Sequence, residues 1–267
     1  MYLIRYCNEK LFSLHAMKKS IDVVTRLRAA LPVSPPALTA TQPDHFDDLR
    51  NVPGSPAKFI RGIDISHHND ITDWTAIKKA NVQFVYIKIS EGVGTPDEKA
   101  KANALAAKEN GLQIGYYHFG RPDKKNDNTI ELDATAEAAE VKILLTELPA
   151  ADLPLMLDLE DTASFDSSLA PKEYLTWVET FLSFFFDPAN PSTNPLIYSR
   201  KEYLERKLPP THTLGTRYKL WLSRYTDDQS KAVPAKGWNK WHIWQFSEKG
   251  VLGTNGNLDL NLKRVAD

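Results

Sequence analysis

Residues 84–119 read FVYIKISEGVGTPDEKAKANALAAKENGLQIGYYHF. The β-branched and aromatic residues of 84–89 predict a strand, and those of 113–119 predict a second one. Between them, Pro96 and Gly111 bound an alanine-rich segment. Proline near the start and glycine just past the end are typical of a helix. The order strand, helix, strand predicts a unit whose two strands run parallel.

The same alternation of strand and helix continues in both directions from this unit. Strands that alternate with helices predict a parallel sheet, and eight strands in about 210 residues predict a closed barrel. The expected fold class is therefore α/β, an incomplete TIM-like (β/α)8 barrel whose second half carries less helix. The further strands are predicted at 59–65, 153–159, 196–199, 220–225, 243–246 and 258–260, and the further helices at 73–80, 129–148 and 171–186.

Residues 1–57 differ in composition from the expected barrel domain, residues 58–267. Several prolines interrupt a polar stretch at 32–57, which is typical of a linker or of an extended arm lying on the domain. The alternatives are an ordered extension with no role beyond packing and an arm that binds a partner for delivery. Residues 1–17 mix charged with apolar side chains, so no clear signal peptide is expected there.

Composition and charge narrow the range of partners. The chain has 267 residues, of which 33 are basic and 34 acidic, for a formal net charge of −1. Such a balance provides no strong field to gather nucleic acid or anionic lipid, so neither is an expected partner. The lone Cys7 excludes an internal disulfide and a thiolate metal site. No apolar run approaches the roughly 20 residues that a membrane span needs. We also expect the protein to be a monomer.

Acidic residues collect where the predicted strands end. In a barrel of this type, functional residues lie at the carboxyl ends of the strands. Asp64, Glu91, Asp158 with Glu160, and Asp259 follow or close four of the predicted strands. Mutual repulsion makes such a gathering costly unless it has a use, so the pattern predicts an active site.

Two of these acids, Asp158 and Glu160, belong to one predicted strand. Side chains two residues apart on a strand share a face and lie roughly 6.5–7 Å apart along the backbone. Two carboxyl groups so placed suit acetal hydrolysis, in which one stays protonated to protonate the leaving oxygen and the other stays ionised. We assign Glu160 as the general acid and Asp158 as its anionic partner. The alternative is an exposed acidic cluster that caps the strand.

The chain resembles the family 25 glycoside hydrolases, lysozymes that cleave between N-acetylmuramic acid and N-acetylglucosamine. The resemblance covers roughly residues 59 to 262 and leaves residues 1–57 outside it. Its motifs, in the order of the family, are Gly62–Ser66 with Asp73-Trp74, Phe84–Gly92, Gly115–Pro122, Pro154–Glu160, Leu220–Tyr225, Trp244-Gln245 and Asp259–Asn261. Family 18 chitinases, which also end a strand in acids, would require an acid in place of Met156.

The resemblance implies a (β/α)5β3 barrel without metal or cofactor that acts on bacterial peptidoglycan in the cell wall. By similarity, Glu160 is the acid/base, and Asp158 orients the acetamido group of the substrate. Asp64 and Asp259 complete the acidic ring. The family is thought to retain configuration with help from that acetamido group, which the strand spacing alone does not decide. A non-catalytic protein that binds cell-wall carbohydrate on the same barrel is the alternative function.

Eight further residues at the strand ends are candidates for substrate contact. For Glu91 the alternative is a pair with a nearby cation, and for Arg121 it is a salt bridge at the rim. For the aromatic residues the alternative is core packing. For His118 a buried, hydrogen-bonded role in support of the carboxylates is favoured over metal binding. The candidates are Glu91, Tyr117, His118, Arg121, Tyr198, Trp221, Trp244 and Gln245.

Overall fold

The computed structural model describes residues 46–49, 59–125 and 129–265, all of which belong to one compact unit, Pro43–Asp267. Most of the predicted extension, residues 1–57, therefore lies outside the described residues. Within the described part, Phe46 packs edge-on against Phe246, with ring centroids 5.6 Å apart. No helix of the described residues is both long and apolar enough to cross a lipid bilayer.

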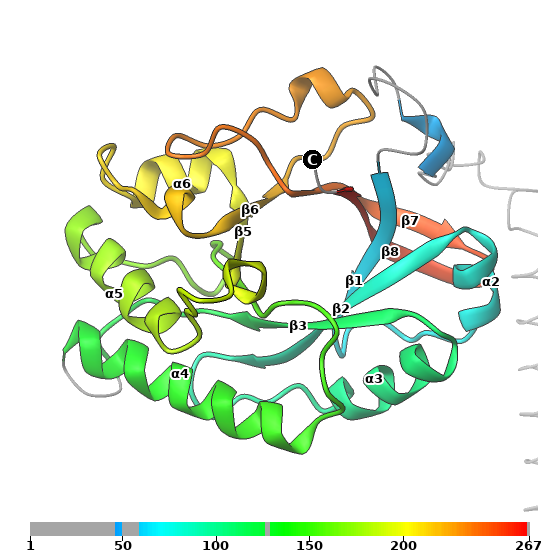
Figure 1. Ribbon diagram of the computed structural model, residues 1–267, viewed down its shortest axis with the longest axis horizontal. Helices are drawn as coiled ribbons and strands as arrows, with labels where there is room; N and C mark the ends of the chain where they lie inside the picture. Colours follow the sequence, from blue (N-terminus) through cyan, green and yellow to red (C-terminus); the bar gives the residue numbers. More distant parts are fainter. Residues whose placement is uncertain (1–45, 50–58, 126–128, 266–267) are drawn as a thin grey trace, which may run out of the picture. The chain divides into compact units, whose positions relative to one another are not determined.

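The described strands form one closed barrel in which β1 to β8 follow chain order, as Figure 1 shows. The barrel class predicted from the alternation of strands and helices is therefore confirmed. The strands are β1 (Phe59–Ile65), β2 (Val82–Glu91), β3 (Gln113–Phe119), β4 (Met156–Asp158), β5 (Leu196–Arg200), β6 (Lys219–Ser223), β7 (Ile243–Leu252) and β8 (Asn255–Arg264). The helices are α2 (Trp74–Lys79), α3 (Ala100–Glu109), α4 (Ile130–Glu147), α5 (Pro171–Ser183) and α6 (Lys201–Lys207), with short 3-10 turns at Phe46–Asp48, Pro191–Thr193, Leu214–Thr216 and Gln229–Lys231.

The last strand departs from the predicted parallel sheet. Strands β1 to β7 pair in parallel, but β8 runs antiparallel to both β7 and β1. Only two residues separate β7 from β8, and one of them, Gly253, adopts a positive φ of 65°. A strand that is to pair in parallel with the one before it needs a crossover of a dozen or more residues. A connection of two residues can therefore only make an antiparallel hairpin. The parallel sheet inferred from the alternation of strands and helices therefore does not extend to β8.

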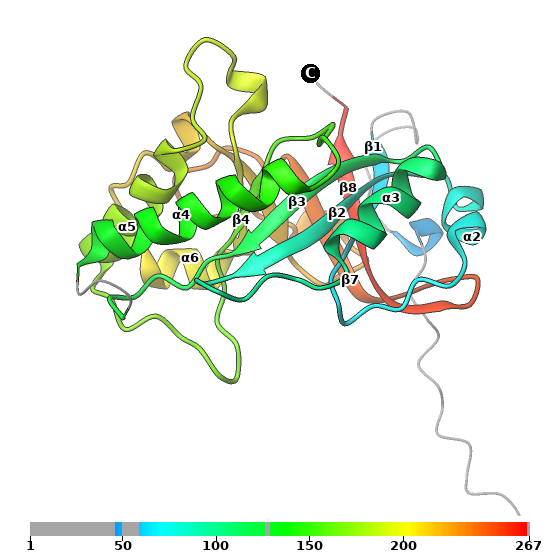
Figure 2. The same ribbon diagram turned by 90° about the horizontal axis from the view of Figure 1, so that it is seen from below.

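The helices cover the outer face of the barrel. Figures 1 and 2 show α3 and α4 running alongside β2 and β3. Leu157 and Leu159 lie in the same buried cluster as Trp177 and Phe181 of α5, so this layer is held together by apolar burial. The predicted helix start at Asp73 is confirmed, because its Oδ1 accepts a hydrogen bond of 2.8 Å from the amide of Ala76. Helix α6 was not predicted.

The interior of the barrel is filled by side chains, many of them aromatic. Two glycines make room for them: a Cβ on Gly62 would lie 2.1 Å from the ring of Phe84, and one on Gly115 would lie 2.5 Å from that of Tyr86. Both glycines are required here by close packing. Trp221 packs against Tyr86, with ring centroids 4.7 Å apart. This layer separates the carboxyl ends of the parallel strands from their amino ends, as expected for a packed barrel core.

Candidate active site

The structure brings four acidic side chains together at the carboxyl ends of the parallel strands. Asp158 is the last residue of β4, and Glu160 follows two residues later. Asp64 lies near the end of β1, directly opposite Asp259 of β8 in the antiparallel pair. The ionisation of each of these groups is influenced by at least one of the others. The site is therefore a cluster of interacting carboxyl groups that share a small number of protons.

Asp158 and Glu160 differ in exposure. Asp158 is 4% exposed, and its Oδ1 has no hydrogen-bond partner among the described residues. Burial raises the pKa of Asp158 well above its ordinary value, and repulsion from Glu160 adds to the effect. Glu160 is half-buried, and burial raises its pKa to about 7 against the lowering influence of Arg200. Glu160 can therefore carry a proton at neutral pH and release it there, as a general acid must.

Asp64 is held by two amide side chains. Asn261 Nδ2 donates to Asp64 Oδ2 at 2.6 Å, and Gln245 Nε2 donates to the same oxygen at 3.0 Å. Asp259 also hydrogen-bonds Asp64, and burial with repulsion from Asp64 raises the pKa of Asp259 to about 9. The proton between these two carboxyl groups therefore resides on Asp259 at neutral pH. Asn261 was not among the predicted site residues, although it lies two positions from Asp259 and so shares its face of the strand.

A second cluster at this mouth is an ion-paired triad of Lys88, Glu91 and Arg121. Lys88 Nζ lies 2.6 Å from Glu91 Oε2, and Arg121 Nε lies 2.9 Å from Glu91 Oε1. Burial opposes the ionisation of Glu91, but the hydrogen bonds from both cations outweigh it and lower the pKa of Glu91. Lys88 also lowers the pKa values of Asp158 and Glu160. It was missed as a site residue, although it is a charged residue within an otherwise apolar strand.

Arg200, at the end of β5, is the cation that acts most strongly on Glu160. It forms an ion pair with Asp161, the residue next to Glu160. Asp161 is also bound by Arg206, whose Nη2 lies 2.9 Å from its Oδ2. The ion pair with Asp161 holds Arg200 in place, and the positive charge of Arg200 opposes the rise in the pKa of Glu160.

Two of the predicted contact residues point away from the site. His118 lies in the layer between the barrel and the helices, 2.8 Å from Glu137 of α4 and 2.9 Å from Ser90. Trp244 is fully buried, and its indole nitrogen donates to the carbonyl of Arg224 at 2.8 Å. Successive side chains of a strand face opposite sides. The buried, hydrogen-bonded role favoured for His118 is therefore observed, with Glu137 as its carboxylate partner, whereas contact with substrate is contradicted for both His118 and Trp244.

Two more predicted contact residues, Trp221 and Gln245, face the interior but lie beneath the site. Trp221 is 0% exposed, and its indole nitrogen donates to Asn261 at 2.9 Å. Gln245 is buried as well and accepts a hydrogen bond of 2.8 Å from the hydroxyl of Tyr198. The burial of both contradicts the prediction of direct contact with substrate: Gln245 itself holds Asp64, and Trp221 fixes Asn261, the other amide that does so.

The aromatic residues at the rim differ in their exposure. Tyr117 and Tyr198 are almost fully buried, and burial raises the pKa values of their hydroxyls, with the nearby carboxylates adding to the effect. Tyr225, which follows β6, is 48% exposed, and burial together with the charge of Asp259 raises the pKa of its hydroxyl. Tyr225 therefore offers an accessible aromatic face beside the carboxyl cluster.

Comparison with known proteins places this arrangement in a family. The sequence model of "Glycosyl hydrolases family 25" matches residues 63–254. The chain is 26% identical over 217 residues to "Lysozyme M1" of Streptomyces globisporus, across 80% of this chain and 71% of that protein. It is 27% identical over 221 residues to "N,O-diacetylmuramidase" of Arthroderma benhamiae, across 78% and 86% of the respective chains.

Solved structures agree with the sequence match. A family 25 lysozyme from Aspergillus fumigatus superposes with a TM-score of 0.63 at 28% identity, covering 78% of this chain and 95% of that one. The bacterial lysozyme of Streptomyces coelicolor superposes with the same TM-score at 25% identity, covering 78% and 93%. With a family match that spans most of the barrel and the same fold in both structures, this chain belongs to glycoside hydrolase family 25.

Proposed function

We propose that this protein is a peptidoglycan hydrolase, a muramidase that cleaves the β-1,4 bond between N-acetylmuramic acid and N-acetylglucosamine. The observation that carries the proposal is the pair Asp158 and Glu160 at the end of β4, with the pKa of Glu160 at about 7. A carboxyl group that is half protonated near neutral pH beside a second, buried carboxyl group suits glycosidic bond cleavage. The family membership and the lysozymes and muramidases among its relatives support the same substrate.

In the proposed first step, Glu160 gives its proton to the oxygen that links the two sugars. As the bond from this oxygen to the anomeric carbon breaks, the acetamido oxygen of the same sugar bonds to that carbon from the opposite face. In the second step, Glu160 removes a proton from a water molecule whose oxygen attacks the anomeric carbon and displaces the acetamido oxygen. Two displacements at one carbon retain its configuration.

Asp158 is proposed to hold the acetamido group during both steps. Its Oδ1 has no hydrogen-bond partner among the described residues, and a buried acceptor without a partner gains most from a donor. The acetamido N–H is such a donor, and it becomes more acidic when its carbonyl oxygen attacks carbon. Burial and repulsion from Glu160 raise the pKa of Asp158, and Lys88 opposes that rise and so favours the ionised form. The raised pKa makes that ionised form a stronger base, which suits it to hold this N–H.

The remaining residues are proposed to shape and bind rather than to react. Asp64 and Asp259, with one shared proton, face the other side of the cluster and keep it acidic. Tyr117 and Tyr225 at the rim are proposed to contact sugar rings, since aromatic faces pack on the apolar faces of pyranose rings. Glu91, fixed by Lys88 and Arg121, is proposed to accept hydrogen bonds from sugar hydroxyls.

The test uses purified peptidoglycan and the Glu160→Gln variant. We expect the wild type to release fragments whose new reducing end is N-acetylmuramic acid, identified by mass spectrometry after reduction. Glutamine keeps the size of the side chain but cannot donate an acidic proton, so the rate should fall by about 10²–10⁴-fold. Glu147→Gln, on the exposed end of α4, is the matched control and should retain full activity.

Three results would contradict parts of the proposal. Equal turnover by wild type and Glu160→Gln would remove Glu160 from the reaction. A reducing end of N-acetylglucosamine would make the enzyme a glucosaminidase. Binding to cell wall without any cleavage by the wild type would favour the non-catalytic alternative.

A further inference from the structure

A pocket of about 480 Å³ opens at the amino ends of the parallel strands, the end of the barrel opposite the carboxyl cluster. Asn194 lies two residues before β5, Lys219 begins β6, and His242 immediately precedes β7. Because β8 is antiparallel, its last residue, Arg264, reaches the same end. The volume is within the ~300–1,000 Å³ that small-molecule sites occupy.

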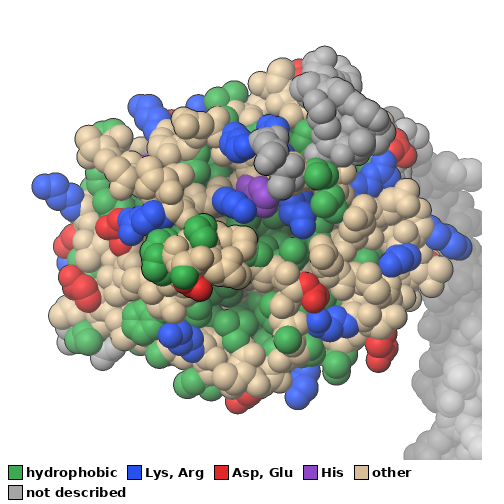
Figure 3. Space-filling model, viewed as in Figure 1, with side chains coloured by type: hydrophobic (Ala, Val, Ile, Leu, Met, Phe, Trp, Pro, Cys, Tyr) green, Lys and Arg blue, Asp and Glu red, His purple; other side chains and the backbone are tan. Residues whose placement is uncertain are grey.

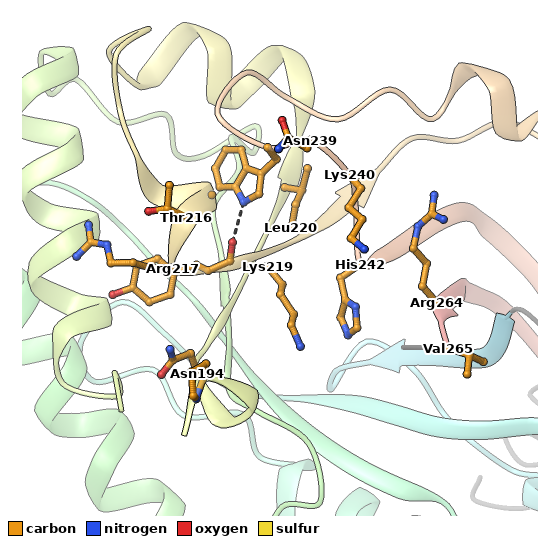
Figure 4. Close-up of a pocket in the computed structure, with 14 residues that line it drawn as sticks. Asn194, Thr216, Arg217, Lys219, Leu220, Asn239, Lys240, His242, Arg264 and Val265 are labelled. Carbon is orange, nitrogen blue, oxygen red and sulfur yellow. Dashed lines mark hydrogen bonds between the residues drawn. The ribbon is translucent and has the colours of Figure 1, made fainter. Parts of the chain in front are cut away.

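Basic side chains gather at this pocket. Figure 3 shows a histidine surrounded by Lys and Arg side chains on the face it presents. In Figure 4, the side chains of Lys219, Lys240 and His242 extend into the same region from β6 and from the segment before β7, with Arg264 of β8 beside them. None of the described residues that line the pocket is acidic. The pocket is therefore lined by one sign of charge.

The positive charges here act on one another. Burial lowers the pKa of His242 to about 4, and Lys219, Lys263, Lys240 and Arg264 lower it further in that order. Burial and Lys219 also lower the pKa of Lys263, whose ammonium group lies 4.9 Å from the centre of the Phe84 ring inside the barrel. Neither Lys219 nor Lys263 forms an ion pair with a carboxylate of the described residues.

Cations that face one another without a carboxylate destabilise the folded chain unless an anion joins them. We propose that this pocket binds a phosphate-bearing anion between Lys219 and His242, which line it, with the ammonium group of Lys263 nearby inside the barrel. A single carboxylate would neutralise only one of the two lysine charges, whereas a free phosphate group carries nearly two and a chain of phosphodiesters carries one on each successive unit. Lysine binds phosphate as a compact point charge. His242 supplies a further donor, and it becomes a third cation if the bound anion raises its affinity for a proton.

Two sources could present this group: a free phosphate compound, or the phosphodiester units of a polyol phosphate polymer. The chemistry at the pocket is the same for both and does not depend on hydrolysis at the opposite end. The probes are therefore inorganic pyrophosphate and a short glycerol phosphate oligomer, each titrated into the full chain by calorimetry. Binding of pyrophosphate assigns the pocket to small anions, and binding of the oligomer alone assigns it to the polymer; either result supports the proposal.

The matched variants are the double substitution Lys219→Gln with Lys263→Gln and the control Lys79→Gln with Lys172→Gln. Both remove two positive charges, but the control lysines are exposed residues of α2 and α5. We expect the first variant to bind the active probe at least about tenfold more weakly and the control to bind as the wild type does. Lys219→Gln alone, an exposed change, should weaken binding without affecting the fold.

A second readout is the histidine spectrum. Proton–carbon NMR, with His242→Asn to assign the signal, should show the pKa of His242 rising when the probe binds, because an anion favours the charged imidazole. The proposal is overturned if neither probe binds at millimolar concentration, if the double variant and the control bind equally, or if binding leaves the His242 signal unchanged.

Discussion

The two ends of the barrel carry opposite charge, although the same strands build both. On β8, Asp259 lies among the carboxyl groups at one end, and Lys263, four residues further, lies among the basic residues at the other. Residues an even number of positions apart share one face of a strand, and Asn261 lies between them, bound to Trp221. One interior face thus changes from acidic to basic across a neutral aromatic layer.

Both ends respond to crowding in the same physical way. Burial disfavours the charged form of each group, and nearby like charges add to the effect at most of them. At the acidic end, the pKa values of Asp64, Asp158, Glu160 and Asp259 are all raised. At the basic end, those of His242 and Lys263 are lowered. The comparison teaches that acidic residues gather at one end of this barrel and basic residues at the other. The acidic end is suited to hold a proton, and the basic end is suited to bind an anion.

The largest effect in this comparison is expected from Asp158→Asn, which tests whether the acidic end is catalytic. Asparagine keeps the shape of the side chain, so the fold should be retained while the rate of peptidoglycan cleavage falls by about 10²–10⁴-fold. The measurement is kcat/KM on soluble peptidoglycan fragments, with Asp70→Asn, an exposed residue of the loop before α2, as the control. A variant that cleaves as fast as the wild type would show that Asp158 serves the fold alone.

Asp259→Asn tests the energetic cost of the crowded acids. The pKa of Asp259 is about 9 in the folded chain, above its ordinary value of 3.8. Between these values the folded state holds a proton that the unfolded state has lost, so the free energy of unfolding falls as pH rises, by up to about 1.4 kcal/mol per pH unit. Asparagine takes up no proton and still offers an N–H to Asp64, so the decline should be shallower and the variant more stable at pH 8.

Urea unfolding at pH 5, 7 and 8 measures this slope, again with Asp70→Asn as the control. Asp70 is fully exposed, and Lys99 lowers its pKa, so its replacement should leave the slope between pH 5 and 8 unchanged. A slope for Asp259→Asn that equals that of the wild type would mean that Asp259 is ionised in the folded chain, and the shared proton would have to reside elsewhere.

The smallest effect is expected from Arg200→Gln, which alters one charge beside the general acid. Without Arg200, the pKa of Glu160 should rise above about 7, because this cation favours the ionised form. The protonated acid then persists to higher pH, and at pH 8 the variant should keep roughly two- to threefold more of its own maximal activity than the wild type does. Lys108→Gln removes a cation paired with Asp152 and should leave the pH profile unchanged. A basic limb that moves to lower pH in Arg200→Gln would contradict the assignment of Glu160.

Much of the fold could be predicted because hydrophobic periodicity, and the residues that begin and end helices and strands, are local properties of the sequence. The strands at 59–65 and 113–119 agree residue for residue with β1 and β3, and Asp73 caps α2 as expected. Helix α6 escaped because it has seven residues and begins directly after β5. The long hairpin β7–β8 escaped because its outer halves carry glycines and charged residues, which weaken the apolar pattern of a strand.

The sequence by itself determined that strands and helices alternate, that eight strands close a barrel, and that acids follow the strand ends. Each of these depends on residues that are neighbours in the chain. Tertiary structure alone decided that β8 runs antiparallel, that His118 and Trp244 point away from the carboxyl cluster, and that basic residues meet at the amino ends. The side to which a side chain points, and the distance between two residues across the barrel, depend on the register between strands that are far apart in the sequence. A net charge of −1 therefore conceals two ends of opposite sign.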